Sequence, residues 1–171
     1  KQSVQALRDL GLRMVILSGD HADVTREIAT EVGIQEFKAN LLPHEKAEYI
    51  EQQRQQGHKV VMVGDGINDA LALSQSEVAI AMGSGADIAV EMSDVVLMKE
   101  TIHSVYEALK IARKTLRTIK QNLAFSLLYN LVTIPLAMMG YVIPLVAAIS
   151  MSLSSLVVVG NAMRMHRFFK T

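Results

Sequence analysis

The sequence has no cysteine, no tryptophan and no acidic residue after Glu107. The absence of cysteine excludes disulfides and thiolate metal sites within this stretch. All 17 Asp and Glu lie at or before Glu107, together with nine of the 17 Lys and Arg, so this part carries a net charge of −8. The rest of the chain, from position 108 onward, carries a net charge of +8, which predicts two regions with different surroundings.

Charged side chains are also absent from Leu123 to Met163. This stretch is about twice as long as one membrane helix requires, because about 20 residues span a hydrocarbon core of about 30 Å. We therefore expect two transmembrane helices, residues 123–140 and 144–163, separated by a turn at Gly140–Pro144. The alternative is a buried hairpin of a soluble protein, but the part of the chain before it is too small to bury two such helices on all sides.

Basic residues flank the uncharged stretch on both sides. A basic linking helix, residues 108–122, is expected before the first span, and a basic tail, residues 164–171, follows the second. The connection between the spans carries no charge, so the positive-inside rule predicts that both ends of the chain are cytoplasmic. The basic helix could alternatively lie on the membrane surface.

The part of the chain up to Glu107 alternates between apolar strand patterns and helical patterns. Because each strand pattern is apolar throughout, we expect a parallel α/β sheet that is covered on both faces, with ligands at the carboxyl ends of its strands. The chain opens without Met, directly in a helical pattern, so we expect a piece of a longer protein. The strand patterns lie at 14–17, 59–66, 78–83 and 94–99, and the helical patterns at 21–34, 43–57, 67–76 and 101–122.

The segment GDGIND places two aspartates around a glycine turn directly after a strand pattern. Gly64 and Gly66 let the backbone turn sharply beside a bound ion. Asp65 could hold Mg²⁺, which offsets the negative charge of a phosphoryl group during transfer. Asn68 and Asp69 could orient water or hold the loop. The alternative is that these are ordinary turn residues, which Gly-Asp-Gly often supplies.

Two further motifs carry groups suited to phosphate. Ser18, Gly19 and Asp20 form a turn after the first strand pattern, where a hydroxyl and backbone N–H groups could hold phosphate oxygens. Lys46 lies near the start of a helix and could place a positive charge on the same oxygens. Taken alone, Ser18 would be a turn residue and Lys46 a solvated helix charge.

The order SGD, then PHEK, then GDGINDA resembles the second, third and fourth motifs of the haloacid dehalogenase-like superfamily. The longer run from Lys59 to Met98 looks like the phosphorylation domain of heavy-metal-transporting P-type ATPases. The resemblance implies a partial haloacid dehalogenase-like α/β domain over residues 1–107, followed by the two-helix transmembrane hairpin. It also implies that Asp65 binds Mg²⁺, that Lys46 and Ser18 contact the phosphoryl group of an ATP-derived phosphoenzyme, and that Asp69 orders the loop.

Two positions depart from the common family pattern. His21 stands where Asn is usual, and Leu71 stands where Pro is usual. More importantly, the family's nucleophile is the Asp of Asp-Lys-Thr-Gly, and no aspartate here is followed by Lys-Thr. The nucleotide-binding domain that the family inserts after that motif is missing too. We therefore expect the later half of a phosphoryl-transfer site, which cannot carry out the reaction alone.

Polar residues within the expected spans require an explanation, because each is costly in hydrocarbon unless it has a partner. Oxygens of Tyr129 and Asn130 and the thioether of Met151 could bind a soft cation, with Ser155 one helical turn from Met151. The alternative is that Ser and Asn only pack between helices, with Ser bonded to its own backbone.

The pairs Tyr-Asn and Met-x-x-Ser-Ser look like the copper-transporting subgroup of the family. The resemblance implies a pump for copper(I), or equally for silver(I), in a bacterial inner membrane. Its partners would be the bilayer, the remaining helices and nucleotide-binding domain of the same protein, and a copper chaperone, with no nucleic acid. Two alternatives are a zinc- or cadmium-transporting relative, which tends to carry an Asp in the last helix, and a membrane-tethered phosphatase or non-catalytic fragment.

Overall fold

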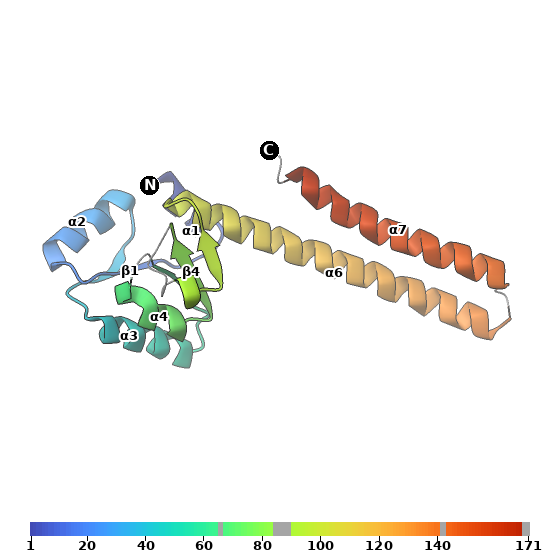
Figure 1. Cartoon of the computed structure of the whole chain (residues 1–171), viewed down its shortest axis with the longest axis horizontal. Helices are drawn as coiled ribbons and strands as arrows, with labels where there is room; N and C mark the ends of the chain where they lie inside the picture. Colours follow the sequence, from blue (N-terminus) through green and yellow to red (C-terminus); the bar gives the residue numbers. More distant parts are fainter. Residues whose placement is uncertain (65–66, 84–89, 141–142, 169–171) are drawn as a thin grey trace. The chain divides into compact units, whose positions relative to one another are not determined.

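The computed structural model describes residues 1–64, 67–83, 90–140 and 143–168. It divides into two compact units, Lys1–Glu107 and Ala108–Thr171. The first unit alternates helices and strands, and the second consists of two long helices (Figure 1). The elements are α1 (Gln2–Asp9), β1 (Val15–Leu17), α2 (Ala22–Val32), β2 (Glu36–Lys38), α3 (Pro43–Gln55), β3 (Val61–Gly64), a 3₁₀ turn (Ile67–Asp69), α4 (Ala70–Gln75), β4 (Val78–Met82), β5 (Val95–Leu97), α6 (Ile102–Met138) and α7 (Pro144–Phe168).

The helices of the first unit begin and end at the residues that the sequence marks. Helix α2 is followed by Gly33 at φ +84°, a left-handed conformation that glycine adopts without strain. Helix α3 has Pro43 at its first position, where the missing N–H is no loss. The Glu45 carboxylate accepts a hydrogen bond of 2.7 Å from the Leu42 N–H and so satisfies one of the free donors at the helix start.

All strand pairs of the first unit are parallel, as the sequence predicts, but they form two sheets. Strand β1 pairs with β2, while β4 lies between β3 and β5. Strand β2 was not predicted from the sequence, because it has only three residues, Glu36–Lys38, of which two are charged and exposed. β1 and β3, which both carry predicted site loops, are not hydrogen-bonded to each other.

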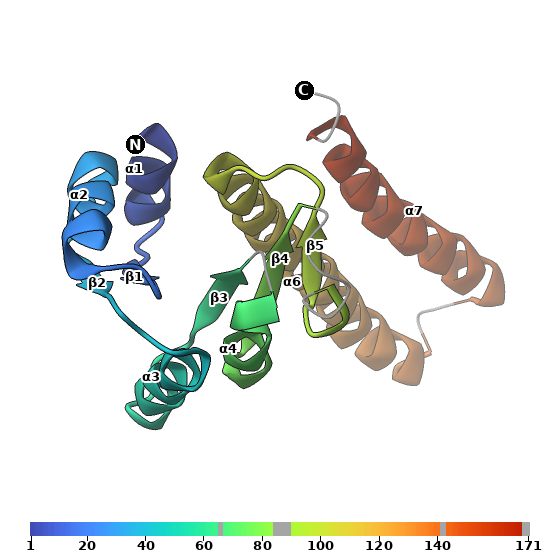
Figure 2. The same ribbon diagram turned by 60° about the vertical axis from the view of Figure 1, so that its left-hand side comes forward.

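A compact apolar cluster joins α3 and α4 to β3 and β4, and Figure 2 shows these helices beside these strands. Leu17, at the end of β1, also packs against this cluster. The opposite face is buried at its centre and more exposed at the starts of its strands: Ile80 is 2% exposed, whereas Val61 and Val78 are 39% and 37% exposed. Since neighbouring strand residues point to opposite faces, both faces of this sheet carry buried side chains, but the cover of the opposite face is partial. The cluster comprises Ile50, Met62, Ala72, Leu73 and Ala79.

The second unit is a helical hairpin in which α6 continues without a break through the predicted boundary at residue 122. Pro135 lies inside this helix. After it, Gly140 adopts φ +77° at the start of the connection, and Tyr141 and Val142 lie outside the described residues. Helix α7 then begins at Pro144.

The hairpin has an unusual distribution of polarity. Hydrogen bonds join α6 to α7. The hydroxyls of Tyr129 and Ser150 lie 2.9 Å apart, and Asn161 Nδ2 donates to Asn122 Oδ1 at 2.8 Å and to Gln121 Oε1 at 3.5 Å. Large apolar side chains of both helices are instead exposed, among them Leu127, Leu131, Ile134, Ile149, Leu153 and Leu156 at 53–72%. Some polar side chains therefore bond to one another between the helices, while many apolar side chains are exposed.

The prediction of two transmembrane helices is not supported by the helices themselves. Over the described residues, neither α6 nor α7 combines enough length with enough hydropathy to qualify as a membrane span. The serines, asparagines and tyrosine within these helices lower their mean hydropathy.

One prediction concerns Glu77, which joins the amino ends of β3 and β4. Its carboxylate accepts hydrogen bonds from the Val60 N–H at 2.7 Å and from Arg54 at 3.0 Å. The Val60 N–H, supported by Arg54, lowers the pKa of Glu77 despite partial desolvation. A lowered folded-state pKa stabilises the fold fully above the ordinary Glu pKa, and this contribution is lost as pH falls through the lowered value.

We therefore expect Glu77→Gln to lower the thermal unfolding midpoint at neutral pH. As the pH falls, the midpoint of the variant should decrease less than that of the wild type. The wild-type and variant midpoints should converge as the pH falls through the pKa of folded Glu77. Thermal unfolding over a pH series measures this. If the two midpoints changed in parallel over the whole pH series, the carboxylate of Glu77 would not stabilise the fold through its lowered pKa.

Candidate functional site

The best-defined contact among the predicted site residues is an ion pair between α3 and the 3₁₀ turn. Lys46 Nζ lies 2.8 Å from Asp69 Oδ1, and the two side chains are only 11% and 15% exposed. Lys46 is thus not the solvated helix charge of the alternative interpretation. The pair joins the second half of the GDGINDA motif to the PHEK motif, as the predicted site requires.

The close approach of Asp69 to the end of β3 depends on a glycine. A Cβ on Gly64 would lie 2.7 Å from Asp69 Cβ and 2.9 Å from Asp69 Oδ2, closer than real side chains approach. Asn68, the neighbour of Asp69, is exposed. Asp65 and Gly66, the predicted Mg²⁺ ligand and its neighbour, lie outside the described residues.

Ser18 and Asp20 form a hydrogen-bonded turn directly after β1. The Ser18 hydroxyl donates to Asp20 Oδ2 at 2.8 Å and accepts from the Asp20 N–H at 3.1 Å. Ser18 is half-buried, whereas Gly19 and Asp20 are exposed. Such a turn presents a hydroxyl and a carboxylate at the carboxyl end of a parallel strand, where α/β sheets bind ligands.

Asn40 and Leu41 connect this turn to the helix that carries Lys46. The Asn40 N–H donates to the Asp20 carbonyl at 2.8 Å, and the Leu41 N–H donates to the Ser18 carbonyl at 3.0 Å. Asn40 adopts φ +55°, a left-handed conformation that Asn tolerates better than most residues. Because α3 begins two residues after Leu41, these bonds fix the Ser18 turn relative to the start of that helix. Sequence analysis missed Asn40, whose only signal is its residue type.

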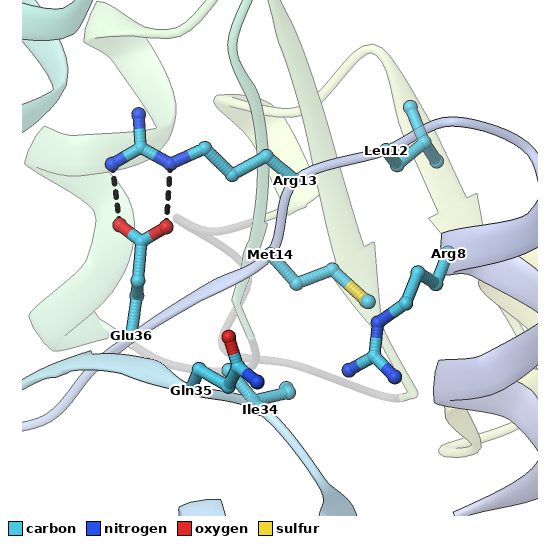
Figure 3. A pocket seen from close by; sticks show the side chains of 7 residues that line it. All are labelled: Arg8, Leu12, Arg13, Met14, Ile34, Gln35 and Glu36. Carbon is cyan, nitrogen blue, oxygen red and sulfur yellow. Dashed lines mark hydrogen bonds and ion pairs between the residues drawn. The ribbon is translucent and has the colours of Figure 1, made fainter.

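A shallow pocket lies at the other end of the β1–β2 sheet, before the first residues of both strands (Figure 3). Figure 3 shows the guanidinium of Arg13 facing the carboxylate of Glu36, to which it is bonded. Arg8 donates to the Gly33 carbonyl. Since these cations already have partners and ligands of parallel sheets bind at the opposite end, the pocket is not the predicted site. Its lining residues are Arg8, Leu12, Arg13, Met14, Ile34, Gln35 and Glu36.

The predicted ion ligands of the hairpin are only partly brought together. Tyr129 bonds to Ser150, which adjoins Met151, so Tyr129 and Met151 lie at a similar level of the two helices. Met151 is 67% exposed and Asn130 is also exposed. The Ser155 hydroxyl donates to the Met151 carbonyl at 3.1 Å, the backbone bond of the alternative interpretation.

Comparisons with known proteins place the chain in a family. A family model described as a haloacid dehalogenase-like hydrolase matches residues 1–76. The chain is 44% identical over 167 residues to a copper-exporting P-type ATPase of Staphylococcus haemolyticus, and 43% identical over 168 residues to one of Mycobacterium tuberculosis. Each alignment covers 98% of this chain. The chain belongs to the P-type ATPase family. It spans about a fifth of the length of these relatives, 21% and 22%.

Solved structures of P-type ATPases agree with this assignment. A zinc-transporting PIB-type ATPase in the E2·Pi state is 34% identical with a TM-score of 0.88, covering 96% of this chain and 27% of that chain. The catalytic domain of the CPx-ATPase CopB-B is 41% identical with a TM-score of 0.59, covering 63% of this chain and 42% of that chain. The predicted family and the haloacid dehalogenase-like fold of the first unit are confirmed.

The Lys46–Asp69 pair generates a prediction for stability. Lys46→Met should lower the free energy of unfolding by about 3–5 kcal/mol, because it leaves a mostly buried carboxylate without its cation. Adding Asp69→Leu should recover much of this loss, since no unpaired charge then remains. Lys59→Met, at an exposed position, is the control and should change stability by no more than about 0.5 kcal/mol.

Denaturant unfolding of the protein and four variants, namely Lys46→Met, Asp69→Leu, the double variant and Lys59→Met, measures these differences. If the double variant were as unstable as both single changes added together, the two side chains would not be coupled and the pair would have no structural role.

Proposed function

We propose that this chain is the later part of an ATP-driven copper(I)-transporting P-type ATPase that works through an aspartyl-phosphate intermediate. The observation that carries the proposal is the buried Lys46–Asp69 pair, which joins two motifs of a phosphoryl-transfer site. The Asn40–Leu41 segment adds the third motif, the Ser18 turn, to the same helix. The copper-exporting activity named for the relatives at 43–44% identity supports the choice of transported ion.

The aspartyl nucleophile would come from a part of the longer protein outside this chain. Within the described part of the chain, β1 and β3 each have an unpaired edge, and they carry the Ser18 turn and the GDGINDA loop at their carboxyl ends. Leu17 of β1 nevertheless packs against the cluster that includes Met62 of β3. A further parallel strand inserted between β1 and β3 would join the two sheets and place its last residues between the motifs. The nucleophile belongs at the end of that strand.

Within this site, Lys46 and Ser18 would bind the phosphoryl oxygens. The Lys46 ammonium has three donors, of which Asp69 uses one in the structure. The Ser18 hydroxyl can rotate from Asp20 toward an incoming phosphoryl oxygen, because its hydrogen is free to turn about the C–O bond. Asp69 holds the ammonium in place and so acts as a positioning residue.

Mg²⁺ would be held by Asp65 together with phosphate oxygens and water. Among the described residues, no three His, Asp or Glu side chains gather as a metal site. One carboxylate is enough for this role, because Mg²⁺ commonly uses one or two carboxylates plus substrate phosphates and keeps several waters. The bound ion offsets the negative charge of the phosphoryl group.

The α6–α7 hairpin would lie in a membrane among other helices of the longer protein. Apolar side chains such as Leu131 and Leu156, 72% and 65% exposed, face outward, while the Tyr129–Ser150 and Asn122–Asn161 bonds lie between the helices. A hairpin in water has the opposite arrangement, whereas helices in lipid pair their polar groups with one another. By the positive-inside rule, the basic residues at both ends would put those ends on the cytoplasmic side.

The transported ion would pass between these helices and others. The Tyr129–Ser150 bond sets Tyr129 near the level of Met151, whose thioether suits copper(I) better than a hard ion. Asn130 and Ser155 would be the other ion ligands that this chain supplies. The Ser155 hydroxyl would first have to turn away from the Met151 carbonyl. The exposure of Met151 leaves its sulfur accessible to an ion held mainly by other helices. Silver(I), which is soft and has the same charge, would bind in the same way.

A zinc pump is the second candidate, because the zinc-transporting PIB-type ATPase is 34% identical over nearly the whole chain. The hairpin favours copper(I): from Leu123 to Met163 it has no carboxylate for a divalent ion, while it has Met151.

The metal dependence of phosphoenzyme formation tests the function. The intact protein that contains this chain is incubated with γ-labelled ATP and either copper(I) or zinc(II), and acid-stable protein label is counted. We expect labelling to depend on copper(I). Labelling that depends on zinc(II) would keep the pump and overturn the ion assignment. No labelling with either metal would favour a non-catalytic membrane-tethered protein.

The same assay tests the Mg²⁺ assignment. Asp65→Ala should abolish labelling in the intact protein, because Mg²⁺ would lose its carboxylate ligand. Asp94→Asn is a suitable control, since Asp94 accepts a hydrogen bond from the Ala79 N–H away from the site and its amide can accept the same bond. Normal labelling of Asp65→Ala would contradict the assignment.

A further inference from the structure

Three cations gather at the end of the hairpin where α6 enters it and α7 leaves it. The Asn122–Asn161 hydrogen bond fixes which residues of the two helices lie at the same level. With a rise of about 1.5 Å per residue, Lys120 lies about 3 Å below this bond on α6, and Arg164 lies about 4.5 Å below it on α7. Arg117 follows one turn below Lys120, so all three cations occupy the same end of the hairpin.

These cations have no acidic partner in their own unit. No Asp or Glu follows Glu107 anywhere in the sequence. Arg117, Lys120 and Arg164 are exposed, and none takes part in an ion pair recorded within the described part of the chain. Three like charges at one end of the hairpin repel one another, so a bound anion would relieve this repulsion.

Exposed apolar side chains lie among the cations, as Leu116 and Ile119 do at 52% and 56%, and continue above them. Leu123 and Phe125 on α6 are 58% and 49% exposed, and Val157 and Val159 on α7 are 54% and 53% exposed. Cations that adjoin exposed apolar side chains match the boundary between phospholipid headgroups and acyl chains. A soluble phosphate compound would match the cations but not the adjoining apolar side chains.

We propose that Arg117, Lys120 and Arg164 form a binding surface for the headgroup phosphates of anionic phospholipids. The proposal rests on the placement of the hairpin in a membrane given above. The planar guanidinium groups of Arg117 and Arg164 can each donate two hydrogen bonds to one phosphate, and Lys120 adds a point charge. Anionic lipid would thereby fix the depth of the hairpin at the end that continues into the α/β unit.

The test compares spin-labelled phosphatidylglycerol with spin-labelled phosphatidylcholine around the intact protein in bilayers. The fraction of each lipid whose motion is restricted by the protein gives their relative association constant. We expect the protein to prefer phosphatidylglycerol, and R117Q/K120Q/R164Q to reduce this preference at least about twofold. One cation near the membrane surface gives about a fivefold preference for anionic lipid at the position beside it. The measured preference is an average over all lipids that contact the protein, so the expected change is smaller.

Two variants serve as controls. Lys1, Lys59 and Lys99 are exposed cations of the first unit, and their joint replacement by Gln removes the same charge without touching the hairpin. R117K/R164K keeps the charge. Both should retain the preference, and added salt should weaken it because it screens exposed charges.

Other outcomes would overturn the proposal. An equal preference in the wild type and the triple Gln variant would show that these cations do not select the headgroup. Inorganic phosphate that abolished the preference, where chloride at equal ionic strength did not, would identify a site for soluble anions. No restricted component for either lipid would overturn the membrane placement as well. Copper(I)-dependent labelling of the same samples tests the pump separately, so the lipid surface can stand where the ion assignment fails.

Discussion

The Lys46–Asp69 ion pair is the contact on which the account of the first unit depends. A buried ion pair adds little to the stability of a fold by itself, because the desolvation of both charges offsets their attraction. Its position joins α3 to the turn after β3, and Gly64 leaves the space that this approach requires. Asn40 and Leu41 then attach the Ser18 turn to the same helix through backbone bonds. The pair therefore holds two motifs together, and the backbone adds the third.

The second unit follows a different constraint, the pairing of polar groups between its two helices. The Tyr129–Ser150 and Asn122–Asn161 hydrogen bonds lie between helices on which many apolar side chains are exposed. The same polar residues lower the mean hydropathy of the helices, and no helix of the described part qualifies as a membrane span. Mean hydropathy thus gives no support for a membrane position, and the exposed apolar side chains are the observation on which that proposal rests.

Much of the first unit could be predicted because local chemistry marks its elements. Pro43 and Gly33 mark the start of α3 and the end of α2, and the apolar runs mark β1, β3 and β4. Strand β2 could not be predicted, since three residues that include Glu36 and Lys38 carry no strand pattern. The two-sheet arrangement and the role of Asn40 depend on pairing between distant segments, which local patterns do not contain. For the site, the motifs identified Lys46 and Asp69, but only the structure shows them in contact.

The most direct test of the central claim is to identify the residue that is phosphorylated. The intact protein is labelled with γ-labelled ATP and digested, and the labelled peptide is identified by mass. The proposal assigns the binding half of the site to this chain and the nucleophile to another part of the protein, so the label should lie on an aspartate outside these 171 residues. A label on an aspartate within them, Asp20 or Asp65 above all, would contradict the division of the site between this chain and the rest of the protein.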